Sequence, residues 1–122
     1  MKIDVDFYEL PDGREPAKLF LESLDKKSRA KMFREIDLLE SNGPDLRFPH
    51  SRYLSNGIFE LRAKQGNDIS RVMYFFYAGS KAILTNGFVK KSQKTPRQEL
   101  ELAIKYRLDY LNNYPPTGGK TK

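Results

Sequence analysis

The sequence contains no cysteine and a single histidine, His50, among its 122 residues. Without thiols the chain can form no disulfide and perform no thiolate chemistry. One histidine without cysteine also argues against a structural zinc site, because such sites combine these two ligand types. We therefore expect neither a metal ion nor a cofactor.

Long apolar runs are absent as well. None approaches the ~20 residues of a membrane span. The N-terminal residues MKIDVDFYEL alternate and carry acids, unlike a signal peptide. We expect a cytoplasmic protein with no membrane partner. Its length predicts a single domain over residues 1–114, followed by a disordered tail over 115–122.

Positive charge is plentiful and unevenly distributed. The chain has 22 basic and 16 acidic residues, a net charge of +6. Between Leu61 and Gln98 there are eight basic residues and one acid, Asp68. This stretch accounts for more than the whole net charge. Solubility does not require such segregation, whereas a sheet face that meets a polyanion does.

Apolar periodicity divides the chain into strands and helices. Alternation at period two predicts strands, apolar spacing of three and four predicts helices, and Pro-Asp-Gly, Asn-Gly and Gly-Ser sequences predict turns. Thr95-Pro96 followed by Gln98 predicts the capped start of a last helix. The expected strands are 2–10, 58–64, 69–77 and 82–90, with a short strand at 52–54 left open, and the expected helices are about 16–24, 27–40 and 96–111.

This succession predicts an α+β fold with the order β-α-α-β-β-β-α. An N-terminal helical hairpin is expected to pack on a mostly antiparallel sheet. We expect the helices to cover one face of that sheet. The other face is then left for a partner.

Strand alternation places Glu60, Arg62 and Lys64 on one face. One interpretation is a solvated strand face with cross-strand ion pairs, for example between Arg71 and Glu60. His50 likewise has two interpretations, either an ordinary loop histidine beside Pro49 or a proton carrier near phosphate.

The segment from Lys90 to Arg97 holds four positive charges and no acid, and it leads into a helix N-terminus. Positive charge there opposes the helix dipole. A bound phosphate would relieve the conflict, because helix N-termini bind anions. A solvated basic loop is the alternative.

Three stretches resemble a known family: IFELR at 58–62, SRVMYF at 70–75 and LTNGFVKKSQKTP at 84–96. They are similar to the HigB-like, phage-related branch of the RelE/ParE toxin superfamily. The resemblance implies a fold like that of microbial ribonucleases and RelE. It also implies the toxin of a type II toxin–antitoxin system.

Such a toxin would be a ribosome-dependent mRNA endonuclease that inhibits translation by metal-free attack of the RNA 2′-hydroxyl group. Its implied partners are the ribosome, mRNA and a helix-turn-helix antitoxin, in a toxin–antitoxin complex that we expect to be a heterotetramer. A ParE-like inhibitor of DNA gyrase is the alternative from another class. A non-catalytic member that binds nucleic acid or its partner is a further one.

The family motifs also imply site residues. Metal-free RNA cleavage needs cations around the phosphate, together with a base and an acid. The implied catalytic residues are Arg62, Arg71, Lys90 and Lys91, and the implied RNA-binding residues are Lys64, Lys94 and Arg97. His50, Glu60 and Tyr114 are further candidates for the acid and the base, whose identity the sequence leaves open.

Overall fold

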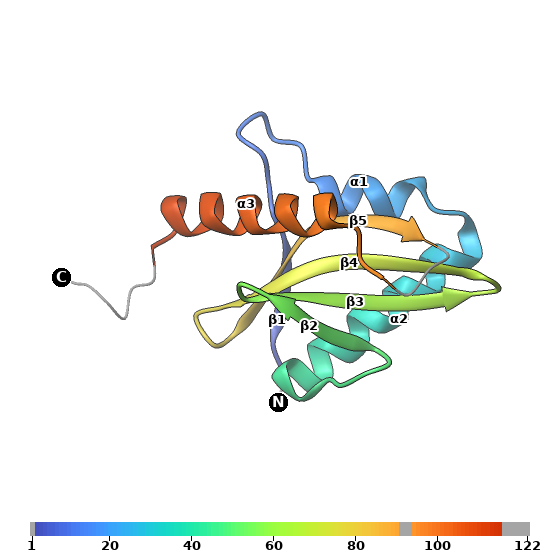
Figure 1. The fold of residues 1–122 in the computed structure, drawn as a ribbon. Helices are drawn as coiled ribbons and strands as arrows, with labels where there is room; N and C mark the ends of the chain where they lie inside the picture. The colour runs from blue at the N-terminus through green and yellow to red at the C-terminus, as the bar shows by residue number, and fades with distance from the viewer. Residues whose placement is uncertain (1, 91–93, 116–122) are drawn as a thin grey trace.

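The computed structural model describes residues 2–90 and 94–115 (Figure 1). The predicted disordered tail therefore lies outside the described residues, apart from Pro115. No helix in these ranges is long and apolar enough to cross a membrane. The elements are β1 (Asp4–Phe7), α1 (Pro16–Ser23), α2 (Lys26–Asn42), the short 3₁₀ helix η1 (Gly43–Asp45), β2 (Ser51–Ser55), β3 (Ile58–Gln65), β4 (Asp68–Tyr77), β5 (Lys81–Lys90) and α3 (Arg97–Asn113).

In this part of the chain, five strands form one sheet in the order β1-β5-β4-β3-β2. Strands β2 to β5 are an antiparallel meander, and β1 pairs in parallel with β5, from Asp4 opposite Lys81 to Phe7 opposite Leu84. Helices α1 and α2 connect the two edges of the sheet. The predicted α+β class is confirmed.

The meander has one strand more than predicted. Strand β2 pairs with β3 across the turn at Asn56 and Gly57, whose φ angles of 53° and 80° suit a two-residue hairpin turn. The observed order is therefore β-α-α-β-β-β-β-α. The short run before Asn56 is a full strand because the hairpin turn aligns it with β3.

Helices α1 and α2 pack together on one face of the sheet, as predicted for the N-terminal pair. The Asp25 side chain caps α2 by accepting the Ser28 amide at 2.7 Å. Helix α1 lies so close to β5 that a Cβ on Gly87 would be 2.3 Å from the Phe20 ring. The core on this face includes Ala17, Leu21, Met32, Ile36, Leu39, Leu61, Val72 and Leu84.

The prediction that one sheet face is left open is wrong, because α3 packs on the face opposite α1 and α2 (Figure 1). Ala103 is fully buried there, and Leu100 and Ile104 pack against the same core. The residues below α3 are apolar: Ile58, Met73, Phe75 and Ile83. Farther along the same face, β3 and β4 carry charged side chains instead.

Candidate functional site

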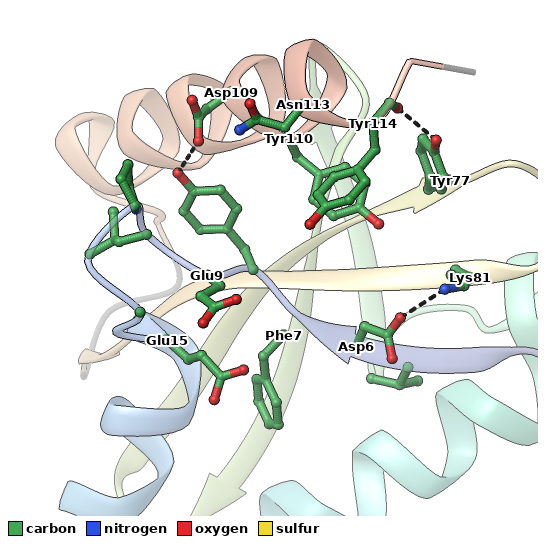
Figure 2. Close-up of a pocket in the computed structure, with 15 residues that line it drawn as sticks. Asp6, Phe7, Glu9, Glu15, Tyr77, Lys81, Asp109, Tyr110, Asn113 and Tyr114 are labelled. Atoms are coloured by element: carbon green, nitrogen blue, oxygen red, sulfur yellow. Dashed lines mark hydrogen bonds and ion pairs between the residues drawn. The ribbon is translucent and has the colours of Figure 1, made fainter. Parts of the chain in front are cut away.

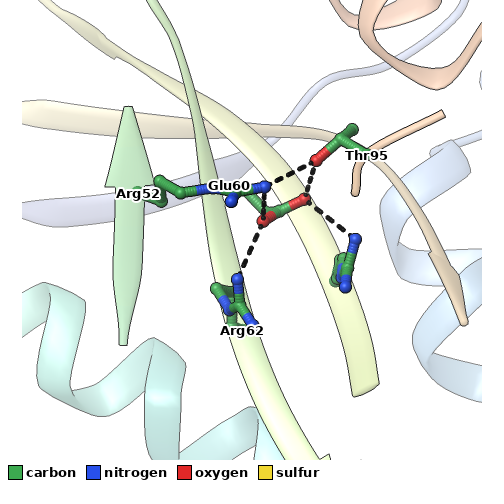
Figure 3. Close-up of polar contacts among 5 residues, drawn as sticks. Arg52, Glu60, Arg62 and Thr95 are labelled. Atoms are coloured by element: carbon green, nitrogen blue, oxygen red, sulfur yellow. Dashed lines mark hydrogen bonds and ion pairs between the residues drawn. The ribbon is translucent and has the colours of Figure 1, made fainter. Parts of the chain in front are cut away.

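Four polar side chains surround the carboxylate of Glu60 at the centre of β3 (Figure 3). Arg52 Nη2 and Arg62 Nη1 lie 3.3 and 3.6 Å from Oε1, and Arg71 Nη1 lies 3.7 Å from Oε2. The Thr95 hydroxyl donates a hydrogen bond of 2.5 Å to Oε2. We call these five residues the Glu60 cluster.

Sheet register brings the members of the cluster together. Arg52 on β2 lies directly opposite Glu60, and Arg62 lies opposite Arg71 on β4. Glu60 and Arg62 are two residues apart on one strand and so face the same side. Thr95 reaches the cluster from the segment before α3, where it also accepts a hydrogen bond of 3.2 Å from Arg52 Nη2.

The interpretation of these residues as a strand face with cross-strand ion pairs is confirmed for the pair of Arg71 with Glu60, but the expected solvation of that face is wrong. Glu60 and Arg71 are fully buried and Arg62 is 8% exposed, whereas Lys64 is exposed. Burial removes charged groups from water, so such charges need paired and hydrogen-bonded surroundings. Burial lowers the pKa of Arg71, and the neighbouring Glu60 carboxylate opposes that effect. The guanidinium stays charged, since arginine does not deprotonate in proteins.

Aromatic rings support two of the guanidinium groups. The Arg71 guanidinium lies 5.7 Å from the Phe88 ring centre, and that of Arg62 lies 5.3 Å from the Phe48 ring centre. Such cation–π contacts orient planar guanidinium groups. The three arginines and Glu60 together have a formal charge of +2, so the cluster favours an anion nearby.

Arg62 also lines a hollow of about 340 Å³ beside the cluster. We call it the His50 hollow, and its lining residues are Lys31, Glu35, Phe48, Pro49, His50, Arg62, Lys64 and Ile69. His50 Nδ1 lies 2.8 Å from Glu35 Oε1 of α2. The backbone amide of Arg62 donates to the His50 carbonyl at 2.9 Å, which fixes the histidine beside β3.

The structure thus brings together Glu60, Arg62 and Arg71, and places His50 and Lys64 in the adjoining hollow. Sequence reasoning missed Arg52 and Glu35. The Asn-Gly turn contained the signal for Arg52, because its register sets Arg52 opposite Glu60. No sequence signal pairs Glu35 with His50, since the contact joins α2 to a distant loop.

The predicted basic segment before α3 is only partly close to the cluster. Lys94 lines a shallow depression with Arg52 and Thr95. Lys90 is exposed at the end of β5, and Lys91 lies outside the described residues. Arg97, at 89% side-chain exposure, forms an ion pair of 3.2 Å with Glu101.

Two further expectations about α3 differ from the structure. Thr95 does not cap the helix; the capping position is Pro96, without a side-chain hydrogen bond, and the Thr95 hydroxyl is directed to Glu60 instead. Tyr114 lies at the far end of α3, where its carbonyl accepts a hydrogen bond of 2.6 Å from the Tyr77 hydroxyl. It is therefore not part of the Glu60 cluster or the His50 hollow.

Tyr114 belongs to a larger pocket of about 930 Å³ between β1, the loop after it and the C-terminal half of α3 (Figure 2). This β1–α3 pocket contains the acids Asp6, Glu9, Glu15 and Asp109 and the aromatic residues Phe7, Tyr8, Tyr77, Tyr110 and Tyr114. Asp6 pairs with Lys81 at 3.1 Å. The buried Tyr8 hydroxyl donates to Asp109 Oδ2 at 2.6 Å.

Within residues 2–90 and 94–115, no group of three or more histidine, cysteine or acidic side chains is placed to hold a metal ion. The chemistry that the cluster and the hollow offer is the binding of an anion by arginine and lysine, next to a histidine that can exchange a proton.

Residues 19–107 match the family model of phage-derived Gp49-like proteins (DUF891). The chain belongs to this family. Gp49-like proteins are a RelE-like family associated with toxin–antitoxin systems. The matched segment of this Gp49-like chain contains the whole Glu60 cluster and the His50 hollow. A comparison with curated proteins finds no match for the chain.

Proposed function

We propose that this Gp49-like protein is the toxin of a type II toxin–antitoxin pair, of the HigB-like kind, and that it cleaves mRNA on the ribosome. The family supports the toxin–antitoxin context. The observation that best supports RNA cleavage is the position of Arg62. It belongs both to a cluster with excess positive charge and to a hollow that contains a histidine and lysines.

In the proposed reaction the RNA 2′-hydroxyl attacks the adjacent phosphate. Arg62 and Lys64 contact the phosphate oxygens, and the negative charge that develops is stabilised by these cations. Arg71 is fully buried, so it acts through its positive charge behind Arg62. Lys90, Lys91, Lys94 and Arg97 bind the neighbouring backbone phosphates.

Glu60 has a different proposed role from the acid or base that the sequence suggests. Its carboxylate is enclosed by three guanidinium groups and the Thr95 hydroxyl. Both carboxylate oxygens are thus engaged by groups of the chain itself. Glu60 therefore holds the arginines in position.

Induced expression followed by primer extension on cellular mRNA tests the activity. We expect cleavage and growth arrest with the wild-type chain, and loss of both with Arg62→Gln or Lys64→Gln. The matched control is Arg14→Gln, because Arg14 forms an exposed pair with Asp12 far from the cluster. Intact mRNA together with a DNA-damage response would instead favour a ParE-like gyrase inhibitor. Intact mRNA without any response would favour a non-catalytic binding protein.

The proposed neutralising partner is a helix-turn-helix antitoxin that forms a heterotetramer with this chain. Family membership supports pairing with an antitoxin. Co-expression with the neighbouring reading frame, followed by light scattering on the purified complex, tests both the partner and the stoichiometry. A monomeric chain that co-purifies with nothing would contradict this proposal.

A further inference from the structure

We propose that Glu35 and His50 form a catalytic pair in the His50 hollow, with His50 as the proton carrier of RNA cleavage and Glu35 as its positioning residue. This inference rests on the proposed function and supplies the base that the Glu60 cluster lacks. Its substrate class is a phosphodiester of single-stranded RNA, seated in the hollow.

The histidine ring is held from two sides. Its Nδ1 atom lies 2.8 Å from Oε1 of Glu35, whose side chain is only 16% exposed on α2. The backbone of His50 is held by its own amide, which donates to the Arg47 carbonyl at 3.0 Å, and by the Arg62 amide at 2.9 Å. A ring fixed at Nδ1 presents its other nitrogen, Nε2, in one orientation.

The carboxylate also selects the tautomer of the ring. When Nδ1–H donates to the Glu35 carboxylate, the lone pair of the neutral imidazole is on Nε2. At 44% side-chain exposure, the ring is accessible to a bound substrate. The arrangement therefore prepares Nε2 to accept a proton.

The surroundings of the ring fit a phosphate. Lys31 of α2 and both Arg62 and Lys64 of β3 line the hollow, and Glu35 is the one acidic residue among its described lining. Because Glu35 is engaged by His50, the remaining charges of the hollow are positive. Phe48, 63% exposed at the rim, offers a ring face on which an unstacked base can lie.

The proposed cleavage requires no reactant other than the RNA and the side chains of the hollow. Nε2 of His50 takes the proton of the RNA 2′-hydroxyl, and the 2′-oxygen forms a bond to phosphorus. The bond from phosphorus to the 5′-oxygen breaks, and that oxygen takes a proton from the Lys31 or Lys64 ammonium group. The products are a 2′,3′-cyclic phosphate and a 5′-hydroxyl end.

The contact between Glu35 and His50 also has a purely structural explanation, in which it only fastens the loop to α2. The two explanations differ in what they require of Nε2 and in the dependence of the rate on pH. A structural contact affects stability and leaves the pH profile of cleavage unchanged.

The experiment measures single-turnover cleavage of a defined mRNA on programmed ribosomes between pH 5 and 8.5, with the wild-type chain, His50→Gln, Glu35→Gln and Asp37→Asn. Asp37 is the control, as an exposed acid on the same helix outside the hollow. We expect the wild-type and Asp37→Asn rates to rise with pH and then level off, as a neutral histidine base requires. His50→Gln should lose about 10²-fold or more, and its rate should lose that rise.

For Glu35→Gln we expect a loss on the order of 10-fold or more in rate, together with a change in the His50 tautomer seen by ¹⁵N NMR of the imidazole. Melting curves of all variants separate loss of folding from loss of chemistry. Cleavage by His50→Gln at the wild-type rate and with the wild-type pH profile would overturn the catalytic pair and leave the proposed function intact. An unchanged tautomer in folded Glu35→Gln would overturn the positioning role. Absence of cleavage by the wild-type chain would overturn the proposed function itself, and the pair's catalytic role with it.

Discussion

The Glu60 cluster and the β1–α3 pocket lie toward opposite ends of α3. They differ in whether their charged side chains are buried or line an open hollow. The cluster places three guanidinium groups around one buried carboxylate, and two of them, Arg62 and Arg71, are buried as well. In the pocket, by contrast, acidic side chains line an open hollow, and the buried Tyr8 contributes an uncharged phenol. Buried charge must be matched by charged and hydrogen-bonding partners, whereas exposed charges keep their contact with water.

The match to the Gp49-like family separates the two regions as well. It begins at Leu19 and ends at Arg107, so it includes the Glu60 cluster and leaves out most of the pocket lining. All of β1 and the end of α3 therefore lie outside the segment that the family match describes. Chemistry that members of the family share is therefore expected at the cluster and not at the pocket.

The largest effect is expected from Glu60→Gln. The substitution keeps the shape of the side chain but leaves three guanidinium groups, two of them buried, without their carboxylate. We expect the free energy of unfolding in urea to fall by about 3–5 kcal/mol. The control is Glu101→Gln, an exposed partner of Arg97, which should change it by about 0.5 kcal/mol or less. Equal effects in both variants would mean that the cluster is not held by buried charge.

In the pocket, Tyr8→Phe should have a smaller effect. Tyr8 is 3% exposed, and its hydroxyl donates a hydrogen bond of 2.6 Å to Asp109. The substitution removes that hydroxyl. A hydrogen bond to a charged group contributes about 1.5–3 kcal/mol, and we expect a loss in that range. Tyr53→Phe on the exposed side of β2 is the matched control. If Tyr8→Phe lowered the free energy of unfolding more than Glu60→Gln, the pocket and not the cluster would contribute more to stability.

The same tyrosine predicts a dependence on alkaline pH. Burial, and then the hydrogen bond to Asp109, raise the pKa of Tyr8 in the folded chain. An unfolded tyrosine ionises near pH ~10, so the stability from neutral Tyr8 is fully present below that pH and is lost as the pH rises above it. The stability difference between wild type and Tyr8→Phe should therefore shrink between pH 9 and 11. A constant difference in urea titrations across that range would contradict this account.

Asp6→Asn should have the smallest effect. The Asp6 carboxylate raises the pKa of Lys81, chiefly through their hydrogen bond, but both side chains are nearly half exposed. We expect an unfolding midpoint that cannot be distinguished from wild type at moderate salt. A destabilisation as large as that of Tyr8→Phe would show that the acids of the pocket are structural.

Much of the fold follows from local pattern. Turn sequences bounded β3, β4 and β5, and the Asp25 cap separated the first two helices. The sheet face on which α3 packs was not predictable. An apolar stripe shows that a helix is buried, but it does not show which face of the sheet the helix covers. Alternation put Glu60 and Arg62 on one face, but it did not show that this face is covered. Arg52 of β2 and Thr95 of the segment before α3 contact Glu60 there, and both contacts depend on tertiary packing.

The site was predictable to the extent that it follows strands. Glu60, Arg62 and Arg71 were recognised because they occupy motif positions on neighbouring strands. Arg52 required the register of a hairpin, and Glu35 required knowledge of where α2 passes the loop before β2. Contacts between elements distant in sequence depend on tertiary packing, which periodicity does not contain.

The position of β5 has a consequence for the order in which the protein can be made. This strand lies between β1 and β4, so residues near the start of the chain find their sheet partner only near residue 81. In a nascent chain that ends before β5, β1 has no strand to pair with. Such a chain also lacks Gly87, on which α1 packs, and Thr95, which donates to Glu60. The ribosome must therefore synthesise the chain as far as Thr95 before the Glu60 cluster can be complete.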